Sequence, residues 1–89
     1  MISAKEARAQ TATNRVRITN QWYDSLMTKA GSQIDGAVCG GYWECTIEGP
    51  ATPMGLEAMG LVRQDLQNMG YAVEAGEFNG KLTTHIMWS

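Results

Sequence analysis

Residues 71–89, "YAVEAGEFNGKLTTHIMWS", contain two runs of alternating side chains on either side of Asn79 and Gly80. Asn-Gly between two such runs is the strongest short-range signal for a β-hairpin, because both residues of its type I′ turn need a positive φ angle. The stretch therefore predicts strands at 71–78 and 81–88.

A two-residue turn also determines the register of the hairpin. Val73 then pairs with Ile86, and the next pair, Glu74 with His85, points to the opposite face. One face collects large apolar side chains: Tyr71, Val73, Leu82, Ile86 and Trp88. Because only this face is apolar, we expect the sheet to bury one side and to leave the other in solvent.

A helix is predicted before the hairpin, at residues 53–69. Thr52 is suited to cap its start, Pro53 to occupy its first position and Gly70 to follow its last turn. The two glycines inside it each cost about 1 kcal/mol relative to alanine, so we expect them to allow close approach of another backbone. The expected inner stripe consists of Leu56, Met59, Val62 or Arg63, Leu66 and Met69.

A third strand is predicted at residues 42–48, which alternate in the same way as the hairpin. Trp43, Cys45 and Ile47 are expected to point into the core, and the residues between them to point outward. Four glycines fall within residues 31–41. They predict a loop at 32–41, because glycine raises the entropy cost of any regular element.

Residues 1–31 are predicted to form one long helix, because 4–30 contain neither glycine nor proline. Ser3 is suited to cap its start and Gly31 its end. The apolar stripe of this helix has the alternating spacing of three and four that is typical of helices packed along a seam. Its members are Ala9, Ala12, Val16, Thr19, Tyr23, Leu26 and Ala30.

The order of elements is therefore helix, strand, helix, strand, strand. A right-handed crossover through the second helix would make the first two strands parallel, with the last strand antiparallel to one or both. The sequence predicts a single α+β domain, residues 1–89, in which a three-stranded mixed sheet carries the helices on one face.

Composition and the first residues exclude several classes of protein. The chain is 44% hydrophobic and 18% charged, which is too apolar for a disordered protein. No apolar run approaches the ~20 residues that a membrane span needs. The first ten residues resemble no secretory leader, so we expect a cytoplasmic protein without membrane contact, whose two cysteines are free thiols.

Charge is distributed unevenly along the chain. Residues 1–31 hold five cations and two anions, a net charge of +3, whereas residues 32–89 hold two cations and seven anions, a net charge of -5. A basic helix on an acidic body is expected to attract an anionic partner or a second copy, although an ordinary solvated helix face is the simpler reading. Long nucleic acids are disfavoured because the acidic body would repel them.

The sequence contains no complete catalytic, cofactor or metal motif. Cys39 and Cys45 are separated by five residues, and a zinc site needs four ligands where only His85 could supplement them. The glycine-rich stretch lacks the lysine of a phosphate-binding P-loop. We therefore predict no catalytic residue, no metal ion and no cofactor.

His85 offers an alternative to a binding function. It is expected to pair with Glu74 in the hairpin, or with Glu44 if strand 42–48 lies beside strand 81–88. Such an acid–base pair is compatible with a small nucleotide hydrolase, but we interpret it as a surface or interface salt bridge, because one pair without a nucleophile, a metal or a second carboxylate defines no reaction.

Aromatic rings and arginines favour binding of a small nucleotide. Rings stack on nucleobases, and guanidinium groups match the geometry of phosphate. The candidate ligand-binding residues are Arg15, Arg17, Trp22, Tyr42 and His85, although core or subunit contact is the simpler interpretation of most of the rings.

The long helix predicts self-association. Its apolar side chains exceed what one small sheet and one helix can cover, and uncovered apolar patches mark interfaces. We expect a homo-oligomer with Val16, Tyr23 and Leu26 at the subunit interface. The alternative is a monomer in which the first ten residues fray.

The chain resembles the short α+β proteins, most without a known activity, that are abundant in tailed bacteriophage genomes. The resemblance lies in "AKEAR" at the start of a long helix, in "LQNMGYAVEAG", where a helix turns into a strand, and in a final strand ending "HIMWS". It implies a non-enzymatic protein of the host cytoplasm that inhibits host defence, by binding a host protein or by sequestering a small nucleotide signal. A structural or virion accessory subunit is a further alternative.

Overall fold

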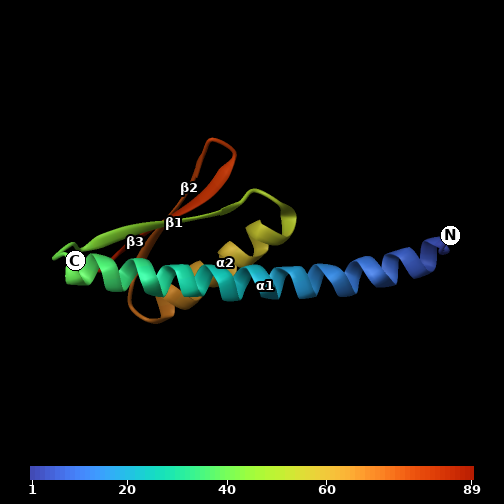
Figure 1. The fold of residues 1–89 in the computed structure, drawn as a ribbon, viewed down its shortest axis with the longest axis horizontal. Helices are drawn as coiled ribbons and strands as arrows, with labels where there is room; N and C mark the ends of the chain where they lie inside the picture. Colours follow the sequence, from blue (N-terminus) through green and yellow to red (C-terminus); the bar gives the residue numbers. More distant parts are fainter.

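The computed structural model describes all residues, 1–89, as two helices and one three-stranded sheet (Figure 1). The elements are α1 (Ala4–Cys39), β1 (Glu44–Pro50), α2 (Pro53–Asn68), β2 (Ala72–Phe78) and β3 (Lys81–Met87). Both helices lie on one face of the sheet, so the predicted α+β class is confirmed. Neither helix combines the length and the apolar character needed to cross a membrane.

The hairpin of β2 and β3 has the predicted turn and register. Asn79 and Gly80 both have positive φ angles, 51° and 76°, as a type I′ turn requires. Val73 is opposite Ile86, and Glu74 is opposite His85. Local turn chemistry and side-chain alternation were therefore sufficient to predict this part of the fold.

The prediction of a mixed sheet is wrong, because every pair of neighbouring strands is antiparallel. The strand order is β1-β3-β2, so the last strand of the chain lies in the centre. β1 and β2 do run in the same direction, but β3 separates them. The central place suits β3, since Leu82, Thr84 and Ile86 are all buried, whereas β2 carries two glutamates and suits an exposed edge.

Helix α1 is longer than predicted. It continues through Gly31 and ends at Cys39, so the loop expected at 32–41 is largely helix. Nothing lies within 4 Å of a Cβ built on Gly31, whereas Ile34 packs against the core. Ile34 is half-buried, and its packing offsets the cost of Gly31 and Gly36, which is about 1 kcal/mol for each glycine in a helix interior. The chain turns only at the next glycine pair, where Gly41 has a φ of 80°.

Strand β1 begins two residues later than predicted. Ile47 is buried and Cys45 is half-buried, as expected, but the side chain of Trp43 is 64% exposed and does not face the core. Trp43 precedes the ladder, which starts where Glu44 pairs with Met87. Only its carbonyl is used, as the acceptor for the backbone N–H of Trp88 at 3.0 Å.

Helix α2 has the predicted caps, and Met59, Val62 and Leu66 of its predicted inner stripe are buried. The side chain of Thr52 accepts a hydrogen bond from the N–H of Gly55, as an N-cap does. A Cβ on Gly55 would lie 2.3 Å from the carbonyl oxygen of Pro50, so this glycine does permit close backbone approach, but the same expectation is wrong for Gly60, where nothing lies within 4 Å of an added Cβ. The other two predicted members of the stripe, Leu56 and Met69, are exposed, and Gly55 and Ala58 are buried instead.

The core lies between the inner face of the sheet and the two helices. Its buried apolar members are Leu26, Ala30, Ile47, Ala58, Met59, Val62, Leu66, Leu82 and Ile86. The first buried residue of α1 is Thr19. Residues 1–18 form a rod that projects beyond the rest of the chain (Figure 1), and they give the molecule its length of 56 Å against a width of 26 Å. We call residues 1–18 the arm.

Candidate functional site

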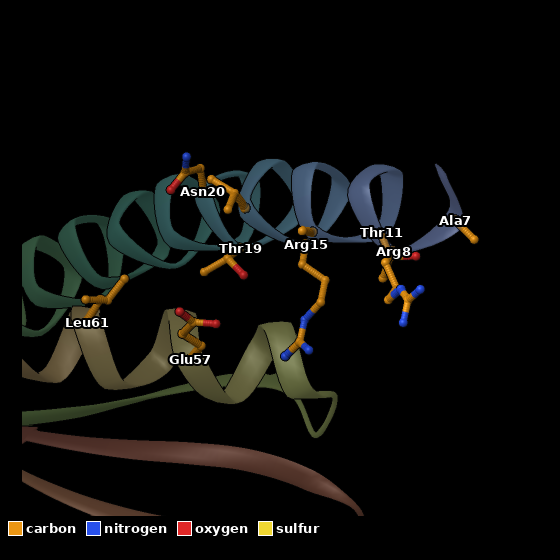
Figure 2. A pocket seen from close by; sticks show the side chains of 10 residues that line it. Ala7, Arg8, Thr11, Arg15, Thr19, Asn20, Glu57 and Leu61 are labelled. Atoms are coloured by element: carbon orange, nitrogen blue, oxygen red, sulfur yellow. The ribbon is translucent and has the colours of Figure 1, made fainter. Parts of the chain in front are cut away.

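An open groove of about 640 Å³ lies in the angle between the arm and α2. Eight of its ten lining residues belong to α1, between Ala7 and Asn20, and the other two are Glu57 and Leu61 of α2. Figure 2 shows their side chains from close by. It is the largest recess on the molecule.

The groove carries charges of both signs. Arg8 and Arg15 are seven residues apart, so they stand two turns apart on the same side of α1. Arg15 extends from α1 towards α2, where Glu57 supplies a carboxylate (Figure 2). None of the three takes part in an ion pair within the chain, because the only ion pairs are Lys81 with Glu48 and His85 with Glu44.

A buried hydroxyl group in this groove has no partner. Thr19 is 5% exposed, and its Oγ1 makes no hydrogen bond. Leaving a buried hydroxyl unpaired costs about 1–3 kcal/mol. Figure 2 shows the Thr19 side chain pointing from α1 towards α2, into the angle that the groove occupies.

The apolar part of the groove is open to solvent. Val16 is 63% exposed and Leu61 is 41% exposed. Their exposure, together with the alanines of the arm, leaves an apolar floor that nothing in the chain covers.

One contact fixes the angle between the two helices just beyond the groove. The hydroxyl of Tyr23 on α1 donates a hydrogen bond to Oδ2 of Asp65 on α2. This hydrogen bond, together with desolvation and the negative charge of Asp65, raises the pKa of Tyr23 above its ordinary value. The two helices are therefore tied together at the end of the groove nearest the core, and no hydrogen bond or ion pair joins the arm to α2.

The five predicted ligand-binding residues do not converge on one site. Arg15 lies in the groove, whereas Arg17 leans along the arm and donates a hydrogen bond to Asn14 at 3.4 Å. Trp22 lines a separate open recess of about 260 Å³ beside β1. Tyr42 lies beside Trp88 at the opposite end of the molecule.

The fifth residue, His85, lies on the outer face of the sheet. Its Nδ1 is 3.0 Å from Oγ1 of Thr46, and its Nε2 is 3.3 Å from Oε2 of Glu44. Glu74 is its neighbour in the register, but the ion pair is made with Glu44. The central position of β3 decides this pairing, because it places β1 directly beside His85.

The three predicted interface residues do not share one exposed surface. Val16 is exposed in the groove, but Leu26 is fully buried in the core of the chain itself. Tyr23 is half-buried and bonded to Asp65. Of these three residues, only Val16 leaves its apolar side chain uncovered.

The cysteines form no shared site. Cys39 is the exposed last residue of α1, and Cys45 is half-buried in β1, where desolvation raises the pKa of its thiol. Both are free, and no group of three or more potential metal ligands occurs.

Three residues of the groove were not predicted from the sequence: Arg8, Glu57 and Leu61. Thr19 was predicted only as part of the stripe of α1, and its unpaired hydroxyl was not expected. The spacing of seven between Arg8 and Arg15 was a visible signal for a shared helix face. The contribution of α2 had no such signal, because only the packing of the two helices brings Glu57 to the arm. Comparison with protein-family models, with curated proteins and with solved structures found no match to this chain.

Proposed function

We propose that this chain is a non-enzymatic binding protein that uses the arm and its groove as the contact surface. In the setting that the bacteriophage resemblance implies, it inhibits host defence by occupying the surface of a host protein. Capture of a small nucleotide signal is the second form of the same proposal.

The observation that supports the proposal is a regular helix without cover. Residues 4–18 are helical, yet none of them is buried. An isolated helix of this length is marginal in water even when it is rich in alanine, and most helical stability in proteins comes from tertiary packing. The arm also contains the β-branched residues Thr11, Thr13, Val16 and Ile18, which lower its intrinsic helicity. A partner on the arm would supply the missing packing.

A protein partner fits the groove better than a nucleotide. The arginines suit phosphate, but no aromatic ring lines the groove to stack on a base, and Glu57 would repel a phosphate. An amphipathic helix needs apolar contacts with charged contacts at their edge, and the groove offers both.

The proposal is tested by plating bacteriophages on hosts that each carry one defence system and express this chain. We expect at least one host to regain plaque formation, and Val16→Asp in the arm to abolish that gain. Val38→Asp is the matched control, because Val38 is a similarly exposed valine at the other end of α1. Failure to restore plating in any host, or equal loss with both variants, would contradict the proposal.

Thermal-shift measurements with cyclic dinucleotides and ADP-ribose derivatives separate the two forms of the proposal. A partner protein alone predicts no shift with these compounds. A shift of several degrees that Arg15→Glu removes would favour signal capture instead.

One observation favours a second function, a small nucleotide hydrolase. The hydroxyl of Thr46, the ring of His85 and the carboxylate of Glu44 form a continuous chain of contacts on the outer face of the sheet. Such a chain is the arrangement by which a base is oriented and a hydroxyl is activated. His85→Ala would abolish turnover of a nucleotide substrate if this function holds, and unchanged turnover in the variant would exclude it.

A further inference from the structure

We infer that the groove is occupied by the arm of a second copy of this chain, in an antiparallel two-fold dimer. The inference rests on the proposed function, in which the arm is a binding surface, and it names the first partner of that surface. Four features of the groove support it, and each concerns a different physical property.

The first feature is charge complementarity within one surface. A two-fold interface uses the same patch on both subunits, so the patch must complement itself. The charged residues of the groove are Arg8 and Arg15 on the arm and Glu57 on the other wall. In an antiparallel pair, Arg8 and Arg15 of each copy approach Glu57 of the other, and the favourable contact occurs twice.

The second feature is the continuity of the seam along α1. The spacing of three and four that begins at Ala9 runs without interruption to Ala30. From Thr19 onward this seam is filled by the chain's own α2 and sheet, and before Thr19 it is empty. A partner helix laid along Ala12 and Val16 would continue the same packing that α2 begins.

The third feature is the small size of the side chains on the arm. The groove is lined in part by Ala7, Thr11 and Ala12. These side chains are too small to prevent a second helix from packing closely against the arm. Close approach would cover Val16 and Leu61, which are 63% and 41% exposed in the single chain. Burial of such side chains is the main favourable term in association.

The fourth feature is the unpaired hydroxyl of Thr19. It is buried, it points into the groove and it has no partner in its own chain. The face of the arm that lines the groove carries exposed polar side chains that can hydrogen-bond to it, Arg8, Thr11 and Arg15. A second arm therefore brings polar groups to the one buried polar atom that lacks them.

The dimer is tested by analytical ultracentrifugation of the full chain across the micromolar range, with charge-reversal variants. Arg8→Glu together with Arg15→Glu places like charges opposite Glu57, and Glu57→Lys places like charges opposite the arginines. We expect each of these variants to raise the dimer Kd by about tenfold or more.

Mixing the two variants is the decisive step. The heterodimer regains both sets of opposite charges, so dimerisation should return in the mixture although each variant alone is mostly monomeric. Pairing of Arg15 with Glu57 inside one chain cannot produce this result. The matched control is Lys5→Glu with Arg17→Glu, which makes the same change of net charge on the arm at residues outside the groove. This control should shift the Kd by less than about threefold.

Three results would overturn the inference. They are a strict monomer throughout the range, a dimer that the charge reversals leave unchanged, and a mixture that stays monomeric. A monomer that gains stability from an acidic helical peptide or a nucleotide, and loses this gain with Arg15→Glu, would assign the groove to that ligand. If the chain is a monomer but Val16→Asp still abolishes the effect on plating, the inference fails and the proposed function stands.

Discussion

At the scale of single residues, Arg63 makes two polar contacts that join elements distant in sequence. Arg63 on α2 donates from Nε to Oγ1 of Thr84 at 2.8 Å and from a terminal nitrogen to the carbonyl of Thr83 at 3.1 Å. Partial burial lowers the pKa of this arginine, but no carboxylate pairs with it. Its role is therefore to satisfy β3, not to form a salt bridge.

Replacement of Arg63 by alanine should destabilise the protein by about 2 kcal/mol, because the fully buried Thr84 hydroxyl loses its partner. Arg63→Lys should cost less, since it keeps a donor but lacks the fork of the guanidinium. The measurement is urea unfolding of the three proteins. Equal stability of wild type and Arg63→Ala would show that the two hydrogen bonds carry no net free energy.

Tyr23 makes the stability of the protein depend on pH in the alkaline range. Its pKa in the folded chain lies above the ordinary value of 10.0, so the folded chain holds the proton more tightly. The stabilisation is complete below pH 10 and is lost as the pH rises through the folded pKa. Denaturant midpoints of wild type should therefore fall more steeply above pH 10 than those of Tyr23→Phe, which is expected to be less stable at pH 8. Parallel curves for the two proteins would contradict this.

At the scale of elements, some glycines of the two helices only lower helix stability, whereas one of them permits close packing. Gly31 and Gly36 have no atom within 4 Å of an added Cβ, whereas Gly55 faces the carbonyl of Pro50. The same residue type therefore weakens α1 at two exposed positions and permits tight packing at the start of α2.

Gly31→Ala and Gly36→Ala should each stabilise the protein by about 0.5–1 kcal/mol, because alanine restricts the unfolded chain and favours helix. Gly55→Ala should destabilise it, since its Cβ would lie 2.3 Å from a backbone oxygen. Thermal unfolding of the three variants measures both effects. A loss of stability with Gly31→Ala would mean that the C-terminal part of α1 has a partner there.

At the scale of the whole molecule, the arm and the compact body should respond differently to concentration. In a dimer the amide protons of residues 4–18 gain protection from exchange as the concentration rises, while those of α2 are protected throughout. Hydrogen exchange measured at low and high micromolar concentration detects the difference. Arm amides that exchange at one rate at all concentrations would contradict dimerisation through the arm.

The parts of the fold that the sequence predicted are those decided by short-range chemistry. The Asn79-Gly80 turn, the register of Val73 with Ile86 and the cap at Thr52 each depend on residues close in the chain. Preferences for backbone φ angles, the alternation of apolar and polar side chains, and helix capping all act within a few residues. They can therefore be recognised in a single sequence.

The tertiary structure alone decided the rest. Burial of Ile34 carries α1 past Gly31, and the apolar pattern of β3 gives it the centre of the sheet between two parallel-running strands. The groove needs Glu57 and Leu61 beside the arm, thirty and more residues away in the chain. Such choices are made by comparing buried areas and contacts of whole elements, and those quantities exist only once the elements have packed.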